Sequence, residues 1–200
     1  MARLLAVMQW PAGRDPAGLY LAACEDDARY DTRDRPRPWG SPVPSLLIRA
    51  ATAADMPALL AWNTAMAWET EHKQLDPVVL KRGIAGVFEQ PRRGFYVVAE
   101  RDGIAVGSLL VTYEWSDWRC GDFWWIQSVY VTPDARRGGV FRALHAEVEQ
   151  RARVAGAVGL RLYVETENLH AQATYADLGM QQCHYLMYES ALPTVADDAG

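Results

Sequence analysis

The sequence is poor in cysteine and histidine. It has three cysteines, Cys24, Cys120 and Cys183, and four histidines among 200 residues. An odd number of scattered cysteines does not build a disulfide framework, and neither residue type recurs at the spacing of a metal site. We therefore expect a protein of a reducing compartment, the cytoplasm, and we assign no metal.

Long hydrophobic runs and an excess of basic residues are also missing. No segment approaches the roughly 20 apolar residues that cross a membrane. The first ten residues lack the longer apolar core and the cleavage site of a signal peptide. The net charge is −5, which is unlike a chain that binds nucleic acid through electrostatics. We expect neither a membrane nor a nucleic acid as partner.

The chain is long enough for one domain with a sizeable core, because half of its residues are hydrophobic. Prolines are concentrated at its start, where residues 1–45 hold six of the eleven. The pattern predicts a proline-rich, poorly ordered arm at 1–45, a folded domain at 46–192 and a loose tail at 193–200.

Residues 46–192 alternate between strand-like and helix-like patterns. Apolar, β-branched runs predict strands at 46–50, 95–100, 104–113, 123–131, 160–165 and 181–188, and helical spacing predicts helices at 56–67, 77–88, 140–155 and 169–178. Arg101-Asp102-Gly103 predicts a hairpin turn. Early hairpins followed by strand–helix–strand crossovers favour an α/β (α+β) fold with a mixed sheet covered by helices.

A strand, a glycine-bearing turn and a helix start follow one another between Val129 and Leu144. Proline stops the strand at Pro133, and Arg136-Arg137-Gly138-Gly139 precedes the helix. The first amides of a helix lack intrahelical partners and carry partial positive charge, to which the arginines add formal charge. The pattern favours a pyrophosphate site, although the residues alone also allow an ordinary tight turn.

A second motif follows the apolar run 158–164. Asn168 is a good helix N-cap, and Gly179 suits the position just past a helix end. Ala171, Tyr175 and Leu178 share one helical face. By itself this motif also describes a capped surface helix with a tyrosine in the core.

Together the two motifs resemble the GNAT superfamily of acyl-CoA-dependent N-acyltransferases. The family's pyrophosphate loop reads Arg/Gln-x-x-Gly-x-Gly/Ala, and residues 136–141 match it except at Phe141. The later family pattern is matched, with correct spacing, by Asn168, Ala171, Tyr175, Gly179 and Met180. The resemblance covers roughly residues 46–192. It implies the GNAT fold, a mixed, mostly antiparallel central sheet flanked by helices and splayed between strands 4 and 5.

The resemblance also implies acetyl-CoA (acyl-CoA) as co-substrate. Its pantetheine would pair with Val129, Tyr130 and Val131 like an added strand, and the backbone N–H near Val129 would be the oxyanion donor. Asn168 and Tyr175 would contact the cofactor. Its pyrophosphate would be held, chiefly by backbone amides, at Arg136, Arg137, Gly138, Gly139, Val140 and Phe141.

The resemblance places Tyr175 in the position of the general acid. A phenol with an ordinary pKa near 10 is protonated at neutral pH, so it can donate to a departing thiolate. The base stays open between Glu69, Glu71, Glu114, Asp117 and a chain of water molecules. Glu69 and Glu71 are two residues apart and cannot share a helix face, so we expect at most one of them to be catalytic.

Tryptophans cluster near the expected acceptor side. Trp115, Trp118, Trp124 and Trp125 fall within eleven residues, and alternate strand positions face opposite ways. The cluster is either core packing or an aromatic wall that attracts a cationic amine. We expect Trp115, Trp125 and Gln127 to contact the substrate. Trp125 and Gln127 also occupy the positions where many relatives carry a strand carboxylate.

These features predict transfer of an acetyl group from acetyl-CoA to a primary amine, by direct attack in a ternary complex, with a small molecule as acceptor. A protein or aminoacyl-tRNA amine is the alternative acceptor. A catalytically idle acyl-CoA-binding module is the alternative function. The pattern ends with one strand where many relatives have two, so we also expect that a homodimer could supply the missing pairing.

Overall fold

The computed structural model describes residues 45–190 and residue 192. The predicted tail at 193–200 lies outside the described residues, and so does the predicted arm, apart from Ser45. Among the described residues, no helix has the length and apolarity needed to span a membrane.

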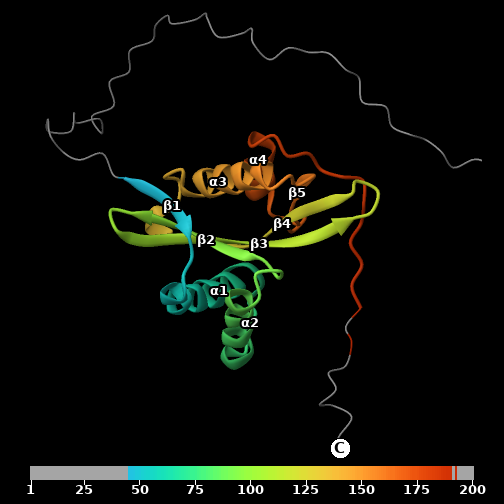
Figure 1. Cartoon of the computed structure of the whole chain (residues 1–200). Helices are drawn as coiled ribbons and strands as arrows, with labels where there is room; N and C mark the ends of the chain where they lie inside the picture. The colour runs from blue at the N-terminus through green and yellow to red at the C-terminus, as the bar shows by residue number, and fades with distance from the viewer. Residues whose placement is uncertain (1–44, 191, 193–200) are drawn as a thin grey trace, which may run out of the picture. The chain divides into compact units, whose positions relative to one another are not determined.

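The centre of the fold is a five-stranded sheet in the order β1-β2-β3-β4-β5 (Figure 1). Its strands are β1 (Leu46–Ala50), β2 (Phe95–Arg101), β3 (Ile104–Ser116), β4 (Gly121–Val131) and β5 (Gly159–Arg161). Neighbours are antiparallel except β4 and β5, which are parallel. The predicted mixed, mostly antiparallel sheet is confirmed.

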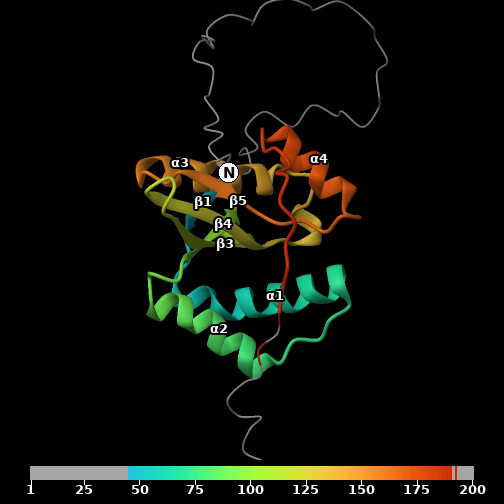
Figure 2. The ribbon, with the colours of Figure 1, turned by 90° about the vertical axis from the view of Figure 1, so that its right-hand side faces the viewer.

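Helices cover both faces of this sheet. They are α1 (Met56–Glu71), α2 (Pro77–Glu89), α3 (Val140–Val154) and α4 (Leu169–Asp177). Figures 1 and 2 show α1 and α2 on one face, and α3 and α4 on the other. A two-residue turn with positive φ at Asp102 and Gly103 joins β2 to β3, as predicted.

Each face of the sheet has its own apolar core. On the α3 face, Val97, Leu109 and Val111 pack with Leu144 and Val148. On the α1/α2 face, Leu59 and Ile84 pack with Tyr96 and Leu110. Alternation along β2 and β3 sends neighbouring side chains to opposite cores, and burial of both faces fixes the strand register.

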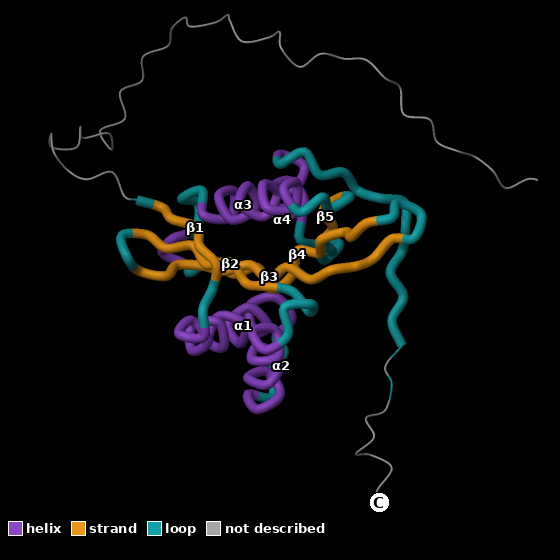
Figure 3. The backbone as a smooth tube through the Cα atoms, viewed as in Figure 1, coloured by secondary structure: helices purple, strands orange, loops and turns teal. Residues whose placement is uncertain are grey.

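The end of the domain differs from the sequence-based prediction. The strand predicted at 160–165 is paired only over Gly159–Arg161, and the strand predicted at 181–188 is absent (Figure 3). The second prediction is wrong for the single chain. A strand exists only where a neighbouring strand receives its backbone hydrogen bonds, and residues 181–188 lie beside none.

Charged side chains fix the connection between β1 and α1. The Asp55 carboxylate accepts a hydrogen bond from the Thr52 amide at 2.7 Å. It also accepts two hydrogen bonds from the Arg49 guanidinium, both at 2.8 Å. Arg49 also reaches Glu100 on β2 at 2.7 Å. Thr52 and Asp55 therefore form a capping box, and Arg49 extends it. The Arg49 guanidinium lowers the pKa of the Asp55 carboxyl to about 2.

We predict that Asp55→Asn lowers the free energy of unfolding by about 2 kcal/mol at pH 7. A depressed folded-state pKa stabilises above the unfolded pKa near 4, and this stabilisation is lost as the pH falls towards 2. Urea unfolding of wild type and variant between pH 2 and 7 measures the difference. A constant difference across that range would contradict the ionic origin.

Candidate functional site

The site begins where β4 and β5 part. β5 pairs with β4 only at Phe123–Trp125, and no strand among the described residues continues this pairing along 126–131. The β4 edge that faces β5 therefore presents unpaired backbone groups, which an extended ligand can meet. The predicted splay between the fourth and fifth strands is confirmed.

A β-bulge interrupts β4 within this open stretch. Leu110 of β3 pairs with Gln127, and Ser108 pairs with Tyr130. Two residues along β3 therefore correspond to three along β4. Ser128 has a φ of 45°, in the left-handed region. A bulge turns backbone groups out of the ladder, and strained backbone of this kind recurs at functional sites. The bulge adjoins Val129, where the sequence resemblance puts the oxyanion donor.

The glycine turn that precedes α3 has the features of an anion cradle. Gly139 is the helix N-cap with a φ of 76°, and no atom lies within 4 Å of where a Cβ would stand. Among the described residues, the amides of Gly139, Val140 and Phe141 have no backbone acceptor. Open space, positive φ and free amides fit a pyrophosphate. Arg137 beside them is exposed.

Gly138 has a different reason to be glycine. Its amide donates to Ala135 O at 3.4 Å, and its carbonyl accepts from Arg101 at 3.2 Å. A Cβ at Gly138 would lie 2.6 Å from the Arg101 guanidinium. Gly138 therefore lets the loop pack against the end of β2.

Arg136 faces the protein rather than the cradle. Its side chain donates to Val131 O at 3.0 Å and to Glu69 at 2.6 Å. Glu69 also accepts the Tyr130 hydroxyl at 3.1 Å. Burial and the Glu69 carboxylate raise the pKa of Tyr130. This group joins the end of α1 to β4 and to the loop.

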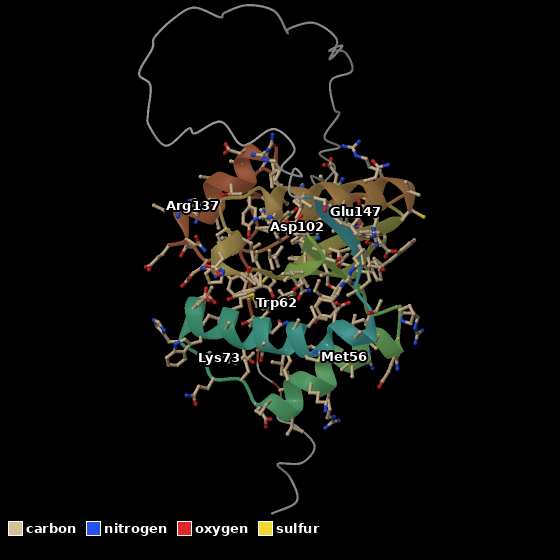
Figure 4. The ribbon with its side chains drawn as sticks, turned by 90° about the vertical axis from the view of Figure 1, so that its left-hand side faces the viewer. Met56, Trp62, Lys73, Asp102, Arg137 and Glu147 are labelled. Atoms are coloured by element: carbon tan, nitrogen blue, oxygen red, sulfur yellow. The ribbon has the colours of Figure 1, made fainter. Side chains whose placement is uncertain are left out.

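An aromatic stack supports the same junction. Trp62 of α1 lies against Tyr130 with ring centroids 6.3 Å apart. Figure 4 shows Trp62 between α1 and the sheet. The ring and the ion pair hold α1 against the strand that carries the bulge.

The α4 motif folds as predicted. Asn168 Oδ1 accepts the Ala171 amide at 3.1 Å, and Gly179 ends the helix with a φ of 83°. Tyr175 is half-buried, and burial raises its pKa, so the phenol keeps its proton at neutral pH.

Phe141, the departure from the family's loop, contacts Tyr175. Their rings meet edge-to-face with centroids 5.6 Å apart, and the Phe141 ring also packs against the α3-face core. The ring thus turns away from the helix N-terminus, which leaves the Phe141 amide available. The Phe141 ring also meets His145, whose pKa is lowered by burial, with ring centroids 6.2 Å apart.

A polar patch lies on the α1/α2 face of β3, β4 and β5. Glu114 accepts from Trp125 Nε1 and, at 2.6 Å, from Arg161. Gln127 donates to Thr112 at 2.6 Å, and the Trp125 ring lies 5.9 Å from Tyr163. The structure thus brings together Glu114, Trp125 and Gln127 from the predicted site.

The other tryptophans lie elsewhere. Trp124 is in the α3-face core, and Trp118 is exposed in the β3–β4 turn. Trp115 pairs with Asp122, which places it on the sheet face opposite Trp125. There it lines a separate cavity of 440 Å³ with Cys120 and Trp124 among others. Strand alternation therefore divides the tryptophan cluster.

The candidate bases differ in their distance from the bulge. Glu114 is opposite Phe123, five residues before Ser128, which corresponds to about 16 Å along a strand. Glu69 contacts Tyr130, two residues past Ser128. Glu71 and Asp117 are both exposed, and neither has a side-chain contact with the residues of the site among the described contacts.

Sequence reasoning missed Arg161, Tyr163, Thr112 and Trp62. Alternation along the predicted strand could have found two of them, because Arg161 and Tyr163 are two residues apart and share one face of an extended strand. Trp62 gave no signal, because it lies at the edge of the apolar stripe of its helix.

Comparisons with known proteins agree with this geometry. The family model for the acetyltransferase (GNAT) family matches residues 52–180. A possible acetyltransferase from Clostridium difficile 630 is similar at 41% identity, with 74% of this chain and 99% of that chain covered and a TM-score of 0.70. A search of curated proteins gave no match.

More distant structures share the fold. An aminoglycoside N-acetyltransferase in complex with CoA has a TM-score of 0.62 at 15% identity, covering 74% of this chain and 96% of that one. Glucosamine-6-phosphate N-acetyltransferase from Arabidopsis thaliana has a TM-score of 0.59 at 17% identity, covering 73% and 98%.

We predict an energetic coupling of about 1 kcal/mol between Glu69 and Tyr130. A double-mutant cycle with Glu69→Ala and Tyr130→Phe, followed by urea unfolding, measures it. The matched cycle combines Glu71→Ala with Tyr130→Phe and should give additive effects. Additivity in both cycles would show that the Glu69–Tyr130 bond does not hold α1 to β4.

Proposed function

The chain belongs to the acetyltransferase (GNAT) family, and on that premise we propose that it transfers an acetyl group from acetyl-CoA to the primary amine of a small molecule. The observation that carries the proposal is the combination of an open β4 edge with an amide cradle at the start of α3. An extended pantetheine and a pyrophosphate need these two features in succession along one strand.

The chain's own residues would hold acetyl-CoA in three places. Backbone groups of Val129, Tyr130 and Val131 lie on the open edge for the pantetheine amides. The amides of Gly139, Val140 and Phe141, with Arg137 beside them, face the pyrophosphate. Gly138 and Arg136 act indirectly, since their contacts fix the loop to Arg101 and Glu69. Asn168 caps α4, the helix that carries Tyr175.

Acetyl-CoA supplies the activated thioester. The acceptor nitrogen forms the new bond to the acetyl carbon, and the carbon–sulfur bond breaks. The Val129 amide at the bulge stabilises negative charge on the acetyl oxygen, a task for which a fixed backbone donor needs no reorganisation. Tyr175 donates its proton to the departing sulfur, and the neighbouring Phe141 ring orients the phenol.

The amine must lose a proton to attack and to become an amide. Glu69 is the candidate carboxylate nearest the bulge, and we assign it as the proton acceptor through water. Its contacts with Arg136 and Tyr130 hold it in place. Glu114 is farther from the bulge and lies beside Trp125, so we assign it to acceptor binding.

The acceptor would lie over Trp125, Gln127 and Glu114 on the α1/α2 face. An indole and a carboxylate together favour a cationic amine, which must displace or share the Arg161 contact. Neighbours in fold are named for an aminoglycoside and for glucosamine-6-phosphate. A panel of amino sugars, aminoglycosides and polyamines is therefore a reasonable first screen.

We predict that saturating acetyl-CoA raises the melting temperature by roughly 5–10 °C. Gly139→Ala fills the cradle and should weaken acetyl-CoA binding at least about tenfold. Gly156→Ala is the matched control, because Gly156 also has positive φ, 73°, and open space at its Cβ position. Both variants should lose similar stability. Equal loss of acetyl-CoA binding in the two would contradict the cradle.

We predict that Tyr175→Phe lowers kcat about 10²-fold or more while leaving the acetyl-CoA melting shift intact. Thiol release with the amine panel measures turnover. Tyr113→Phe is the control, since burial also raises the pKa of that phenol outside the site. Burial raises the pKa of Tyr175 above that of an ordinary phenol, so no fall in kcat between pH 7 and 9 should depend on Tyr175.

The amine panel also distinguishes the enzyme from the alternative function, an acyl-CoA-binding module without turnover. An acyl-CoA-binding module would show the melting shift with acetyl-CoA and no thiol release with any amine. Unchanged turnover in Tyr175→Phe would instead leave the enzyme intact and remove the general-acid role.

A further inference from the structure

The cavity beside Trp115 lies outside the machinery proposed above. It has a volume of 440 Å³, and its walls come from the β3–β4 hairpin and from residues 155–157, which directly follow α3. Figure 1 shows this hairpin extending beyond α3. The sheet face past the end of the helix therefore stays open, and the volume falls within the range of small-molecule sites, roughly 300–1,000 Å³.

The β3–β4 register gives this cavity an aromatic wall. Tyr113 is opposite Trp124, and Trp115 is opposite Asp122, so the four side chains share the α3 face of the sheet. The Tyr113 and Trp124 rings meet edge-to-face with centroids 5.6 Å apart. Trp124 is only 7% exposed, whereas Trp115 is 62% exposed. The wall thus has a buried base and one indole left available to a ligand.

The charge at this cavity is of one sign. Asp122 is the only charged residue among those that line it. Its carboxylate takes part in none of the salt bridges between described residues. Residues 155–157 add the C-terminal end of α3, which carries partial negative charge. Both features favour a cation.

The nearby basic residues do not neutralise the cavity. Arg119 and Arg161 lie over the Phe123 ring, 5.2 and 3.6 Å from its centroid. Phe123 stands between the two β4 residues of the cavity, so its side chain is on the opposite sheet face. The two arginines in the last turn of α3 are each paired with a glutamate one turn earlier.

We propose that this cavity binds an alkylammonium ion, with a trimethylammonium head beside the Trp115 ring and the Asp122 carboxylate. A methylated ammonium spreads its charge over its methyl groups and needs no hydrogen-bond acceptors, so aromatic rings and one carboxylate are sufficient for it. A primary ammonium has three donors to satisfy, and a divalent metal needs more oxygen ligands than one carboxylate supplies.

This ligand is distinct from the acetyl acceptor. The acceptor is proposed to lie over Trp125 and Glu114, on the other face of the sheet. A quaternary nitrogen also has no lone pair with which to attack a thioester, so the ion bound here is not a substrate. The inference therefore goes beyond the proposed function and does not depend on it.

A titration of the isotope-labelled protein with choline, followed by nuclear magnetic resonance, tests the proposal. The indole N–H signal of Trp115 should shift saturably, with a Kd in the millimolar range or tighter. The control ligand is the neutral carbon analogue of choline, in which a tert-butyl group replaces the trimethylammonium. It has nearly the same shape and should bind at least about tenfold more weakly, because only the charge differs.

Matched variants locate the site. Asp122→Asn and Trp115→Leu should each weaken choline binding about tenfold or more, and Asp122→Glu should restore most of it. Trp118→Leu removes an indole of the same hairpin that is 91% exposed and does not line the cavity, so its affinity should equal that of the wild type. Glu114→Gln removes the carboxylate of the opposite face and should also leave choline binding unchanged. The Trp124 indole signal reports whether each variant keeps its fold.

Thiol labelling gives an independent measure of location. Cys120 lines the cavity and is exposed, and Cys183 is exposed elsewhere. Choline should slow the reaction of a neutral maleimide with Cys120 and leave the rate at Cys183 unchanged. Equal effects on the two thiols would place the ligand outside the cavity.

Three results of the titration would overturn the proposal. They are no saturable shift at roughly 50 mM choline, equal affinity for choline and its neutral analogue, and loss of binding in Glu114→Gln rather than in Asp122→Asn. The last result would assign choline to the acceptor patch. All of these readouts are made without acetyl-CoA, so they stay decisive if the proposed function fails.

Discussion

The parting of β4 from β5 is the constraint on which the rest of the site depends. Beyond Trp125 and Arg161 the two parallel strands no longer pair, and β4 continues for six residues with one free edge. Free backbone groups are costly where neither protein nor water satisfies them. Here they lie beside the bulge at Ser128 and lead directly into the glycine turn. A single strand therefore supplies one side of the gap between β4 and β5, the bulge, and the chain that leads into the anion cradle.

The β4 side and the β5 side of this gap differ in how well they are packed against the rest of the domain. On the β4 side, α3 buries five residues against the sheet, and Arg136, Glu69 and Trp62 tie the loop and α1 to Tyr130. On the β5 side, three paired residues and a helix without buried residues carry Tyr175. The binding groups are thus on rigid elements, while the proposed proton donor is on the element with least support. Among the described residues, the aromatic contact of Phe141 with Tyr175 supports that side.

Local signals in the sequence predict most of the elements, and long-range pairing limits the rest. The Asp102–Gly103 turn, the Asn168 cap and the Gly139 helix start follow from the conformational preferences of single residues, and the structure has all three. The strand at 181–188 fails because its existence depends on a neighbour that its own residues cannot specify. The division of the tryptophans follows only from the β3–β4 register, which sends Trp125 and Trp115 to opposite faces. The pairing of Glu114 with Arg161 spans 47 residues and has no local signature.

Phe141 departs from the family's loop motif, yet its backbone amide stays available and its side chain packs elsewhere. The loop needs the amide at this position, and a side chain is tolerated if it points away from the helix N-terminus. The Phe141 ring does so, and the space it enters lies between α3 and Tyr175. A glycine or alanine there would leave α4 without this contact, which is worth about 1 kcal/mol for an aromatic pair. In a chain whose α4 has no buried residue, a larger residue at this position compensates for the thin packing of the helix that carries the phenol.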